Sequence, residues 1–425
     1  LADSYRIDDT QILRRLIARR CVFGCDLNPV AVELARLSIW IHTFVAGLPL
    51  GFLDHNLRVG NSLTGIGVIS EVDDFLGEDN FLTHQIADQL SESSRQLQRL
   101  ATVNDARITD VEAARQAVAE AQEALNPMRR LLDLIVLRRA QLIDIEPMAL
   151  AETSVVDARH STEQVQELLA ALRPVHFPIE FPEIFSGPTS GFNCILGNPP
   201  WEKIMMKEDS YWATKRPGLL SFPPKIRLEV IEDLKEDPAL ADAYERRSVY
   251  YQLVRQTLTS GPYPDLNTGN ADFYKAFAWR FWDLIGSDGV IGVVLPRTAL
   301  SGLGSASWRE HILENGDFIE CTIGTNRGGW LFDDAEHRLT IAFVSIRKSG
   351  EPDREVALRG PFSSYETYRQ GKIEPPGVLP VDGLKSWSEG VAFPIIRSAA
   401  AIDTFMRIRN CPDLCETFSV RLIQG

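Results

Sequence analysis

The sequence predicts an α/β fold whose sheet is interrupted by a large helical insertion. Residues 21–44 and 191–201 each contain a short apolar run that ends in a polar turn, as strands do when they leave a sheet. Between them, residues 78–186 contain no glycine and are rich in Ala, Gln, Glu, Leu and Arg. Apolar residues recur there at helical spacing, which predicts a bundle of about four helices.

Bulk composition limits the class of protein. A chain of 425 residues is too long for one compact domain, so two or three units are expected. The formal net charge of −14 excludes a surface broadly coated with positive charge, so contact with nucleic acid needs a local cleft. The most apolar stretch, residues 37–53, contains His42 and Pro49 and is too short to span a bilayer comfortably. We therefore expect a soluble protein with no membrane partner.

The six cysteines are too few and too scattered for a disulfide scaffold, which favours a reducing cytoplasm. Two pairs have the spacing Cys-x-x-x-Cys, namely Cys21 with Cys25 and Cys411 with Cys415. This spacing permits zinc, but the first pair flanks a predicted strand, where small buried thiols are ordinary. We therefore expect no metal.

The apolar run Phe192–Leu196 predicts a buried strand, and Gly197-Asn-Pro-Pro-Trp201 follows it at once. Two prolines fix the backbone there and remove two donors. Asn198 and the Pro199 carbonyl can accept hydrogen bonds, and Trp201 adds a flat apolar face. This set suits an aromatic ring that carries an amino group. The alternative is a strand-end turn with a packed tryptophan.

A second strand end lies near the beginning of the chain. The pattern predicts a strand over Cys21–Cys25 and a helix over Ala31–Phe44, with Asp26 between them. An acidic residue at the carboxyl end of a strand in a doubly wound sheet is placed to accept hydrogen bonds from ribose hydroxyls. In the other interpretation, Asp26 only caps the following helix.

These motifs resemble those of the N6-adenine DNA methyltransferases, in the gamma-type order. Asn198-Pro-Pro-Trp201 resembles the catalytic motif, which implies roles in catalysis for Asn198, Pro199, Pro200 and Trp201. Gly24-Cys-Asp-Leu-Asn-Pro29 looks like the second motif, and this likeness implies that Asp26, Leu27 and Asn28 hold the ribose of S-adenosylmethionine. Gly60-Asn-Ser-Leu-Thr-Gly65 resembles the third motif, so Asn61 and Ser62 would meet the cofactor adenine; alone, this is ordinary turn chemistry.

Downstream elements follow in the order that this family has. A helix capped by Asn270, a turn at Gly286–Gly289, a strand over Val290–Leu295 and a helix over Ser301–Glu314 are predicted. Strands over Phe318–Ile323 and Thr340–Arg347 come next. In the family, the turn between such strands carries an aromatic residue that stacks on the flipped adenine. We assign this role to Phe332, with Trp330 as its nearest rival.

The resemblance implies a Rossmann-like methyltransferase sheet and four parts of the chain. They are a cofactor-binding part (1–76), the helical insertion (77–175), a catalytic part (176–350) with an insertion at 202–268 expected over the substrate cleft, and a linker with the start of a target-recognition-like domain (351–425). The family's Gly-rich first motif should precede Asp26, yet Leu1–Arg20 contains no glycine. We expect that motif upstream of Leu1, since the chain reads as a piece of a longer protein.

The function implied is transfer of a methyl group from S-adenosylmethionine to N6 of an adenine in double-stranded DNA, within a type II restriction–modification or phage-defence system. Residues 177–185 resemble the lead-in of enzymes in which methylase and nuclease share one chain. Further domains for cleavage or target recognition, or separate subunits, are therefore expected partners. Two alternatives stay open: an amino-methyltransferase acting on RNA or on protein glutamine, and an inactive binding or scaffold fragment.

Overall fold

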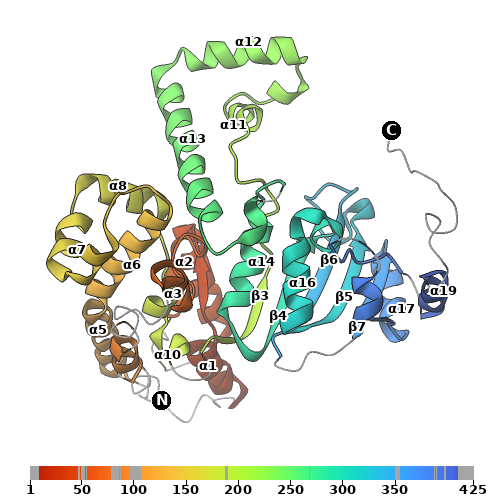
Figure 1. The fold of residues 1–425 in the computed structure, drawn as a ribbon, viewed down its shortest axis with the longest axis horizontal. Coiled ribbons are helices and arrows are strands. Elements are labelled where there is room, and N and C mark those ends of the chain that lie inside the picture. Colours follow the sequence, from red (N-terminus) through yellow and green to blue (C-terminus); the bar gives the residue numbers. More distant parts are fainter. Residues whose placement is uncertain are drawn as a thin grey trace. The chain divides into compact units, whose positions relative to one another are not determined.

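The structure is a computed structural model (Figure 1). The chain divides into two compact units. Unit 1 comprises Leu1–Ser190 and Ile204–Pro262, and unit 2 comprises Gly191–Lys203 and Tyr263–Gly425. The residues described are 9–45, 48, 53, 55–77, 86, 88–95, 97, 107–186, 190–267, 269–349, 355–386, 388, 390–396 and 399–409. Within these ranges, no helix has both the length and the apolar character needed to cross a membrane.

Unit 1 contains a small parallel sheet. Strand β1 (Gly24–Asp26) pairs with β2 (Leu57–Val59), and Asn28 caps the intervening helix α2 (Pro29–His42), with Pro29 in its first turn. The strand Cys21–Cys25 was therefore predicted too early, because helix α1 continues through Cys21. The other helices beside this sheet are α1 (Asp9–Cys21), α3 (Ser70–Leu76), α9 (Phe177–Glu180) and α10 (Pro182–Phe185).

The described part of residues 77–175 is dominated by helices, as the missing glycines and the helical spacing indicate. Two of them are separated at Leu125, directly before Asn126-Pro127, close to the predicted break, and Pro127 lies in the first turn of the second helix, where its missing N–H costs no helical hydrogen bond. The most buried is α6, whose Leu132, Leu134 and Ile135 are fully inaccessible. The elements are α5 (Ile108–Ala124), α6 (Asn126–Arg139), η1 (Pro147–Ala151), α7 (Thr153–His160) and α8 (Glu163–Leu172).

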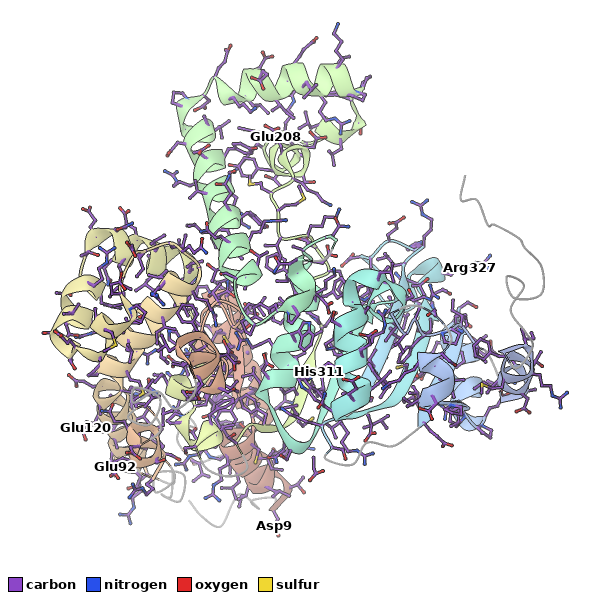
Figure 2. The ribbon with its side chains drawn as sticks, in the orientation of Figure 1. Asp9, Glu92, Glu120, Glu208, His311 and Arg327 are labelled. Atoms are coloured by element: carbon purple, nitrogen blue, oxygen red, sulfur yellow. The ribbon has the colours of Figure 1, made fainter. Side chains whose placement is uncertain are left out.

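Residues 208–259 form a helical arm with a small core of its own. Trp212, Leu219 and Ile231 are buried together, and Tyr244 stacks on Trp212 with ring centroids 5.3 Å apart. Glu208, labelled in Figure 2, pairs with Lys235 at 2.8 Å. The polar composition hid this core from sequence reasoning. The helices are α11 (Glu208–Lys215), η2 (Leu219–Ser221), α12 (Pro224–Lys235) and α13 (Pro238–Thr259).

Unit 2 is built on a six-stranded mixed sheet in the order β3-β4-β6-β5-β7-β8. Strands β3, β4, β5 and β7 run in one direction, because β6 lies antiparallel between β4 and β5, and β7 is parallel to β5. The α/β class is thus confirmed. The strands are β3 (Phe192–Gly197), β4 (Ile285–Pro296), β5 (Asp317–Thr325), β6 (Thr340–Arg347), β7 (Glu355–Phe362) and β8 (Gly377–Pro380).

Helices α14 (Phe273–Leu284) and α16 (Ala306–Asn315) lie on the same side of this sheet (Figure 1). Trp279 and Trp282 of α14 contact the His311 ring of α16, with centroids 5.2 and 5.5 Å apart. The helices of unit 2 are η3 (Pro264–Asn267), α14 (Phe273–Leu284), α15 (Thr298–Ser301), η4 (Leu303–Ser305), α16 (Ala306–Asn315), η5 (Arg327–Gly329), α17 (Tyr365–Ile373), α18 (Val381–Lys385) and α19 (Ala399–Arg409).

Three predicted details of unit 2 are wrong. Residues 286–289 continue β4 instead of forming a turn, because Asp288 N–H donates to the Lys348 carbonyl at 2.7 Å and Lys348 N–H donates to Gly289 at 3.0 Å. The N-cap position of helix α14 is Asp272, not Asn270, and the Asp272 side chain makes no capping hydrogen bond. The helix predicted over 301–314 is broken at Gly302. In the first case long-range pairing overrides the local pattern.

Strands β7 and β8 belong to the segment for which a linker and a new domain are predicted. In the structure they extend the unit 2 sheet, with β7 pairing to β5 and β8 to β7. Trp387, where the further domain was predicted to begin, lies outside the described residues.

Candidate functional site

In unit 1, two parallel strands bring the turns after them to one edge. Asp26 is in register with Val59, and the N–H of Gly60 donates to the Asp26 carbonyl at 2.9 Å. The residues predicted to hold a cofactor therefore lie in two adjacent turns. We call them the Asp26 turn (residues 26–28) and the Asn61 turn (residues 60–62). The carboxyl edge of parallel strands is where ligands bind in open α/β sheets.

The Asp26 turn presents a carboxylate to solvent. Oδ1 of Asp26 accepts the N–H of Asn28 at 2.7 Å, which orients the carboxylate, and its second oxygen gives it further capacity to accept from a hydroxyl. Asn28 itself caps α2, since its Oδ1 accepts the N–H of Val30 at 3.0 Å. The side-chain cap of the helix is thus Asn28, not Asp26. Leu27 is 40% exposed and adds an apolar contact beside the carboxylate.

The Asn61 turn is more enclosed. Oδ1 of Asn61 accepts the N–H of Leu63 at 3.1 Å, so part of its polar capacity is used within the turn. Its side-chain NH2 group can still donate to a ring nitrogen. Asn61 is buried and Ser62 is half-buried.

Cys25 is a packing residue of β1. Its Sγ donates to the Gly60 carbonyl at 3.4 Å. Burial, with the nearby carboxylates of Glu180 and Asp26, raises the pKa of this thiol to about 12. Among the described residues, no three His, Cys, Asp or Glu side chains are grouped to hold a metal ion. Cys411 and Cys415 lie outside the described residues.

In unit 2, the turn Asn198–Trp201 leaves the carboxyl end of β3, as predicted. Asn198 and Pro200 are exposed, and Pro199 is buried. Trp201 is half-buried, and its Nε1–H donates to the Val294 carbonyl of β4 at 3.4 Å. The strand itself is not buried as predicted: Leu196 is 82% exposed, because β3 is the edge strand of the described sheet.

Two contacts of helix α14 hold this turn. A Cβ on Gly197 would lie 2.6 Å from the Phe281 ring, so only glycine allows the ring to pack against the backbone directly before Asn198. On the other side of the turn, the N–H of Phe273 donates to the Glu202 carbonyl at 2.9 Å. Lys203 then forms a β-bridge with Asp272. The acceptor groups of the turn are therefore fixed at both ends by the same helix.

The loop after β5 reaches the same edge of the sheet, because β5 runs parallel to β3. Asn326 organises it from a fully buried position. Trp330 is turned toward the sheet, since its Nε1–H donates to the Thr325 carbonyl at 2.7 Å and its ring lies 6.3 Å from that of Tyr368. Phe332 is half-buried, and its backbone is bonded to Asn326 on both sides. Arg327, labelled in Figure 2, is exposed at the beginning of this loop.

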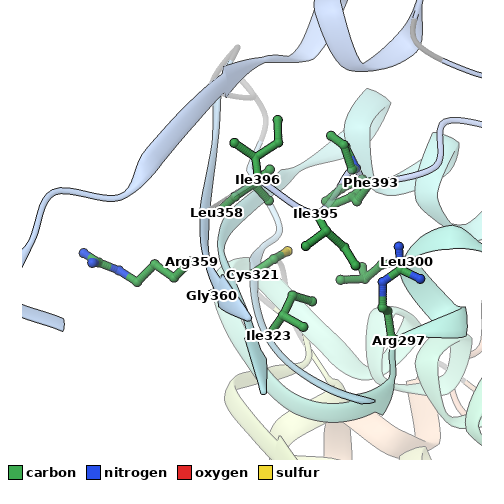
Figure 3. Close-up of a pocket in the computed structure, with 11 residues that line it drawn as sticks. Arg297, Leu300, Cys321, Ile323, Leu358, Arg359, Gly360, Phe393, Ile395 and Ile396 are labelled. Atoms are coloured by element: carbon green, nitrogen blue, oxygen red, sulfur yellow. The ribbon is translucent and has the colours of Figure 1, made fainter. Parts of the chain in front are cut away.

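A small cavity lies elsewhere in unit 2, beneath the residues that follow β4, and Figure 3 shows its lining. Its volume of about 10 Å³ is close to that of one water. Cys321 faces it, and burial raises the pKa of this thiol, which therefore stays protonated. None of the predicted site residues lines this cavity.

One protein family matches the part of the chain that contains both sets of residues. Residues 20–218 match the Eco57I restriction-modification methylase family. The matched segment includes both the Asp26 turn and Asn198–Trp201. It supports a methylase of a restriction–modification system. No curated protein matches the chain.

Solved structures of restriction–modification proteins are similar only weakly. A chain of a type I restriction–modification system has 11% identity and a TM-score of 0.29, with 94% of this chain and 89% of that chain covered. A modification subunit of a putative type I restriction enzyme from Vibrio vulnificus YJ016 has 12% identity and a TM-score of 0.27, with coverages of 70% and 67%. The type IIG restriction endonuclease BpuSI has 11% identity and a TM-score of 0.22, with 69% of this chain and 41% of that chain covered. At these scores the likeness decides neither fold nor activity.

Sequence reasoning missed the residues that hold these turns in place. Neither Phe281 nor Asn326 was predicted to hold a site turn. Arg173 also escaped, although its guanidinium bonds the Leu27 carbonyl of the Asp26 turn, and so did His176, which bonds Ile66 a few residues after the Asn61 turn. A buried Asn directly after a strand is a usable signal, because its amide can cap loop backbone groups. The other contacts are long-range and leave no local pattern.

Proposed function

We propose that this protein is an S-adenosylmethionine-dependent DNA methyltransferase that methylates N6 of a flipped-out adenine. The observation that carries the proposal is the Asn198–Trp201 turn at the carboxyl edge of the unit 2 sheet, within the segment that matches a restriction-modification methylase family. We place the enzyme in a type II restriction–modification or phage-defence system of the cytoplasm, on a Rossmann-like sheet. Double-stranded DNA and further domains or subunits for cleavage and target recognition are its proposed partners.

The residues of unit 1 fit the nucleoside part of the cofactor. Asp26 offers a carboxylate oriented by Asn28 N–H, which suits ribose hydroxyls, and exposed Leu27 suits an apolar ring. Asn61 and Ser62 add donors for the adenine edge. When bound, S-adenosylmethionine supplies an electrophilic methyl group on its sulfonium.

The residues of unit 2 fit an extruded base. An adenine inside a duplex hides its amine, so it has to leave the stack before reaction. Aromatic faces compensate for the lost stacking by about 1–3 kcal/mol per base. Trp201 offers one such face. We assign the second to Phe332 over Trp330, because the Trp330 indole is already bonded to Thr325 and packed near Tyr368.

Asn198 Oδ1 and the Pro199 carbonyl accept the two hydrogens of the amine in this proposal. Accepting both hydrogens draws the nitrogen toward sp3 geometry and directs its lone pair at the methyl group. The proton leaves after the methyl group arrives, so no strong base is required. Pro200 has no N–H that would compete for the acceptors. Much of the rate enhancement then comes from aligning two bound reactants.

The test uses protein expressed from the complete reading frame, unmethylated duplex DNA and cofactor labelled on its methyl group. We expect label in N6-methyldeoxyadenosine after digestion to nucleosides. Asn198→Ala should lower transfer by at least about 100-fold, as loss of an aligned polar group does in other enzymes, while cofactor affinity stays unchanged.

Asn315→Ala, which removes an exposed amide on helix α16, is the matched control and should keep full activity. Label in RNA or in protein glutamine, with none in DNA, would replace the proposed substrate. Cofactor binding without transfer to any of these would favour a scaffold role. Full activity in Asn198→Ala would refute the assigned site.

A further inference from the structure

One short segment of unit 1 contacts both cofactor turns. This segment, Leu172–Phe177, runs from the last residue of helix α8 to the first residue of α9, and we call it the strap. Residues 61–66 run beside it. The N–H of Asn61 donates to the Arg173 carbonyl at 2.7 Å, that of Val175 to Asn61 at 3.2 Å, and that of Phe177 to Ile66 at 2.9 Å; Thr64 Oγ1 donates to Leu172 at 3.0 Å. A Cβ on Gly65 would lie 2.1 Å from the Val175 carbonyl oxygen, which shows how close the two backbones are.

Arg173 connects the strap to both turns. Its carbonyl accepts from the Asn61 turn, and its guanidinium NH1 donates to the Leu27 carbonyl of the Asp26 turn at 3.1 Å. Its φ of 47° lies in the left-handed region, which is unfavourable for a residue with a side chain. The chain therefore adopts a costly backbone conformation at the residue that makes both contacts.

His176 connects the strap to the helical insertion. The ring is fully buried, and its Nδ1 accepts the N–H of Ile66 at 3.0 Å. Nε2 is then the protonated nitrogen of the neutral ring, and it donates to Asp133 Oδ1 of helix α6 at 3.0 Å. The second oxygen of Asp133 is 3.0 Å from Nε2 of His160 on α7. Two insertion helices thus fix the orientation of His176.

We propose that Arg173, His176 and Asp133 are positioning residues for the cofactor, through which the helical insertion sets the spacing of the Asp26 and Asn61 turns. This inference rests on the proposed function. None of the three needs to touch the cofactor. Arg173 and His176 each act through a backbone group of residues 27–66, and Asp133 acts through the His176 ring. The insertion is then a part of the cofactor site, independent of any contact that it makes with DNA.

The test compares binding of S-adenosylmethionine by calorimetry with KM and kcat for methyl transfer. Arg173→Ala should raise both Kd and KM for the cofactor by about tenfold, the effect of losing one hydrogen bond to a charged donor, with kcat within twofold. Arg173→Lys keeps a donor for Leu27 and should restore most of the affinity. Asp133→Ala should weaken binding as well and should speed amide exchange at residues 61–66.

The matched control is Arg130→Ala. Arg130 lies on the same helix as Asp133 but pairs with Asp157 at 2.7 Å, away from the strap. Arg130→Ala should lower stability slightly and leave the affinity for S-adenosylmethionine unchanged. Unchanged cofactor affinity in Arg173→Ala, beside a wild type that binds, would refute the positioning role alone, as would an equal loss in Arg130→Ala. A wild type that binds no cofactor would overturn the proposed function, and the positioning role with it.

Discussion

The side-chain amide of Asn326 binds the backbone of Phe332 on both sides. Nδ2 donates to the Phe332 carbonyl at 2.9 Å, and Oδ1 accepts the Phe332 N–H at 3.1 Å. The same amide bonds Leu331 N–H and the Ala335 carbonyl, at 3.2 Å each. The aromatic side chain proposed to stack on the base is therefore carried by a loop that one buried residue shapes.

Asn326→Ala should destabilise the protein strongly. Several backbone groups of the loop would lose their partner, and an unsatisfied buried group costs about 1–3 kcal/mol, so we expect a loss of about 3 kcal/mol. Urea unfolding measures this loss in the free energy of unfolding. Asn315→Ala removes an exposed amide bonded to the His311 carbonyl and should change stability by no more than about 0.5 kcal/mol. Equal effects of the two substitutions would contradict the role of Asn326.

Phe332→Ala should weaken DNA binding more than stability, and Trp330→Ala should do the reverse. Loss of a stacking face from Phe332 should weaken binding of duplex DNA with 2-aminopurine at the target adenine by about 1–3 kcal/mol, and lower the fluorescence rise that reports base extrusion. Trp330→Ala should reduce stability more than DNA binding, because its indole bonds Thr325. The reverse pattern would make Trp330 the stacking residue.

Gly197→Ala should displace the turn Asn198–Trp201, which follows it directly. The added Cβ would meet the Phe281 ring at 2.6 Å, and overpacking of this kind costs about 1–3 kcal/mol. Activity should fall together with stability. The double substitution Gly197→Ala with Phe281→Leu removes the obstructing ring and should recover part of both. Additive losses in the double variant would show that the two residues do not interact.

The lowered pKa of the Asp133 carboxyl predicts that the free energy of unfolding depends on pH. Burial raises its pKa, but hydrogen bonds from His160 and His176 outweigh this effect and hold the pKa below its usual value. A depressed folded-state pKa adds stability that is fully present above the unfolded pKa of about 4, and that is lost as pH falls through the lower folded value. The stability difference between wild type and Asp133→Asn should therefore shrink as pH is lowered from 5 toward 3, measured by urea unfolding. A difference independent of pH would mean that the charge of Asp133 does not contribute.

Much of the local structure could be predicted because short sequence patterns determine it. Apolar runs between glycines or turns predicted β3 and the strand over Thr340–Arg347, with little or no error in their bounds. Asn126-Pro127 correctly separated two helices. The turn predicted at Gly286–Gly289 failed, because pairing with Lys348, far along the chain, keeps these residues in the sheet.

The sequence by itself determined which polar residues end the strands, Asp26 and Asn198 above all, and so the chemistry that the protein offers. Only the tertiary structure decided what holds those residues. Ile66 and His176 are 110 residues apart along the chain, and Thr64 and Leu172 are 108 apart. Such bonds depend on where helices and strands pack and not on local spacing. Hydrogen bonds between residues far apart along the chain have no fixed sequence spacing, so a partner can be named only once packing has brought it within about 3 Å.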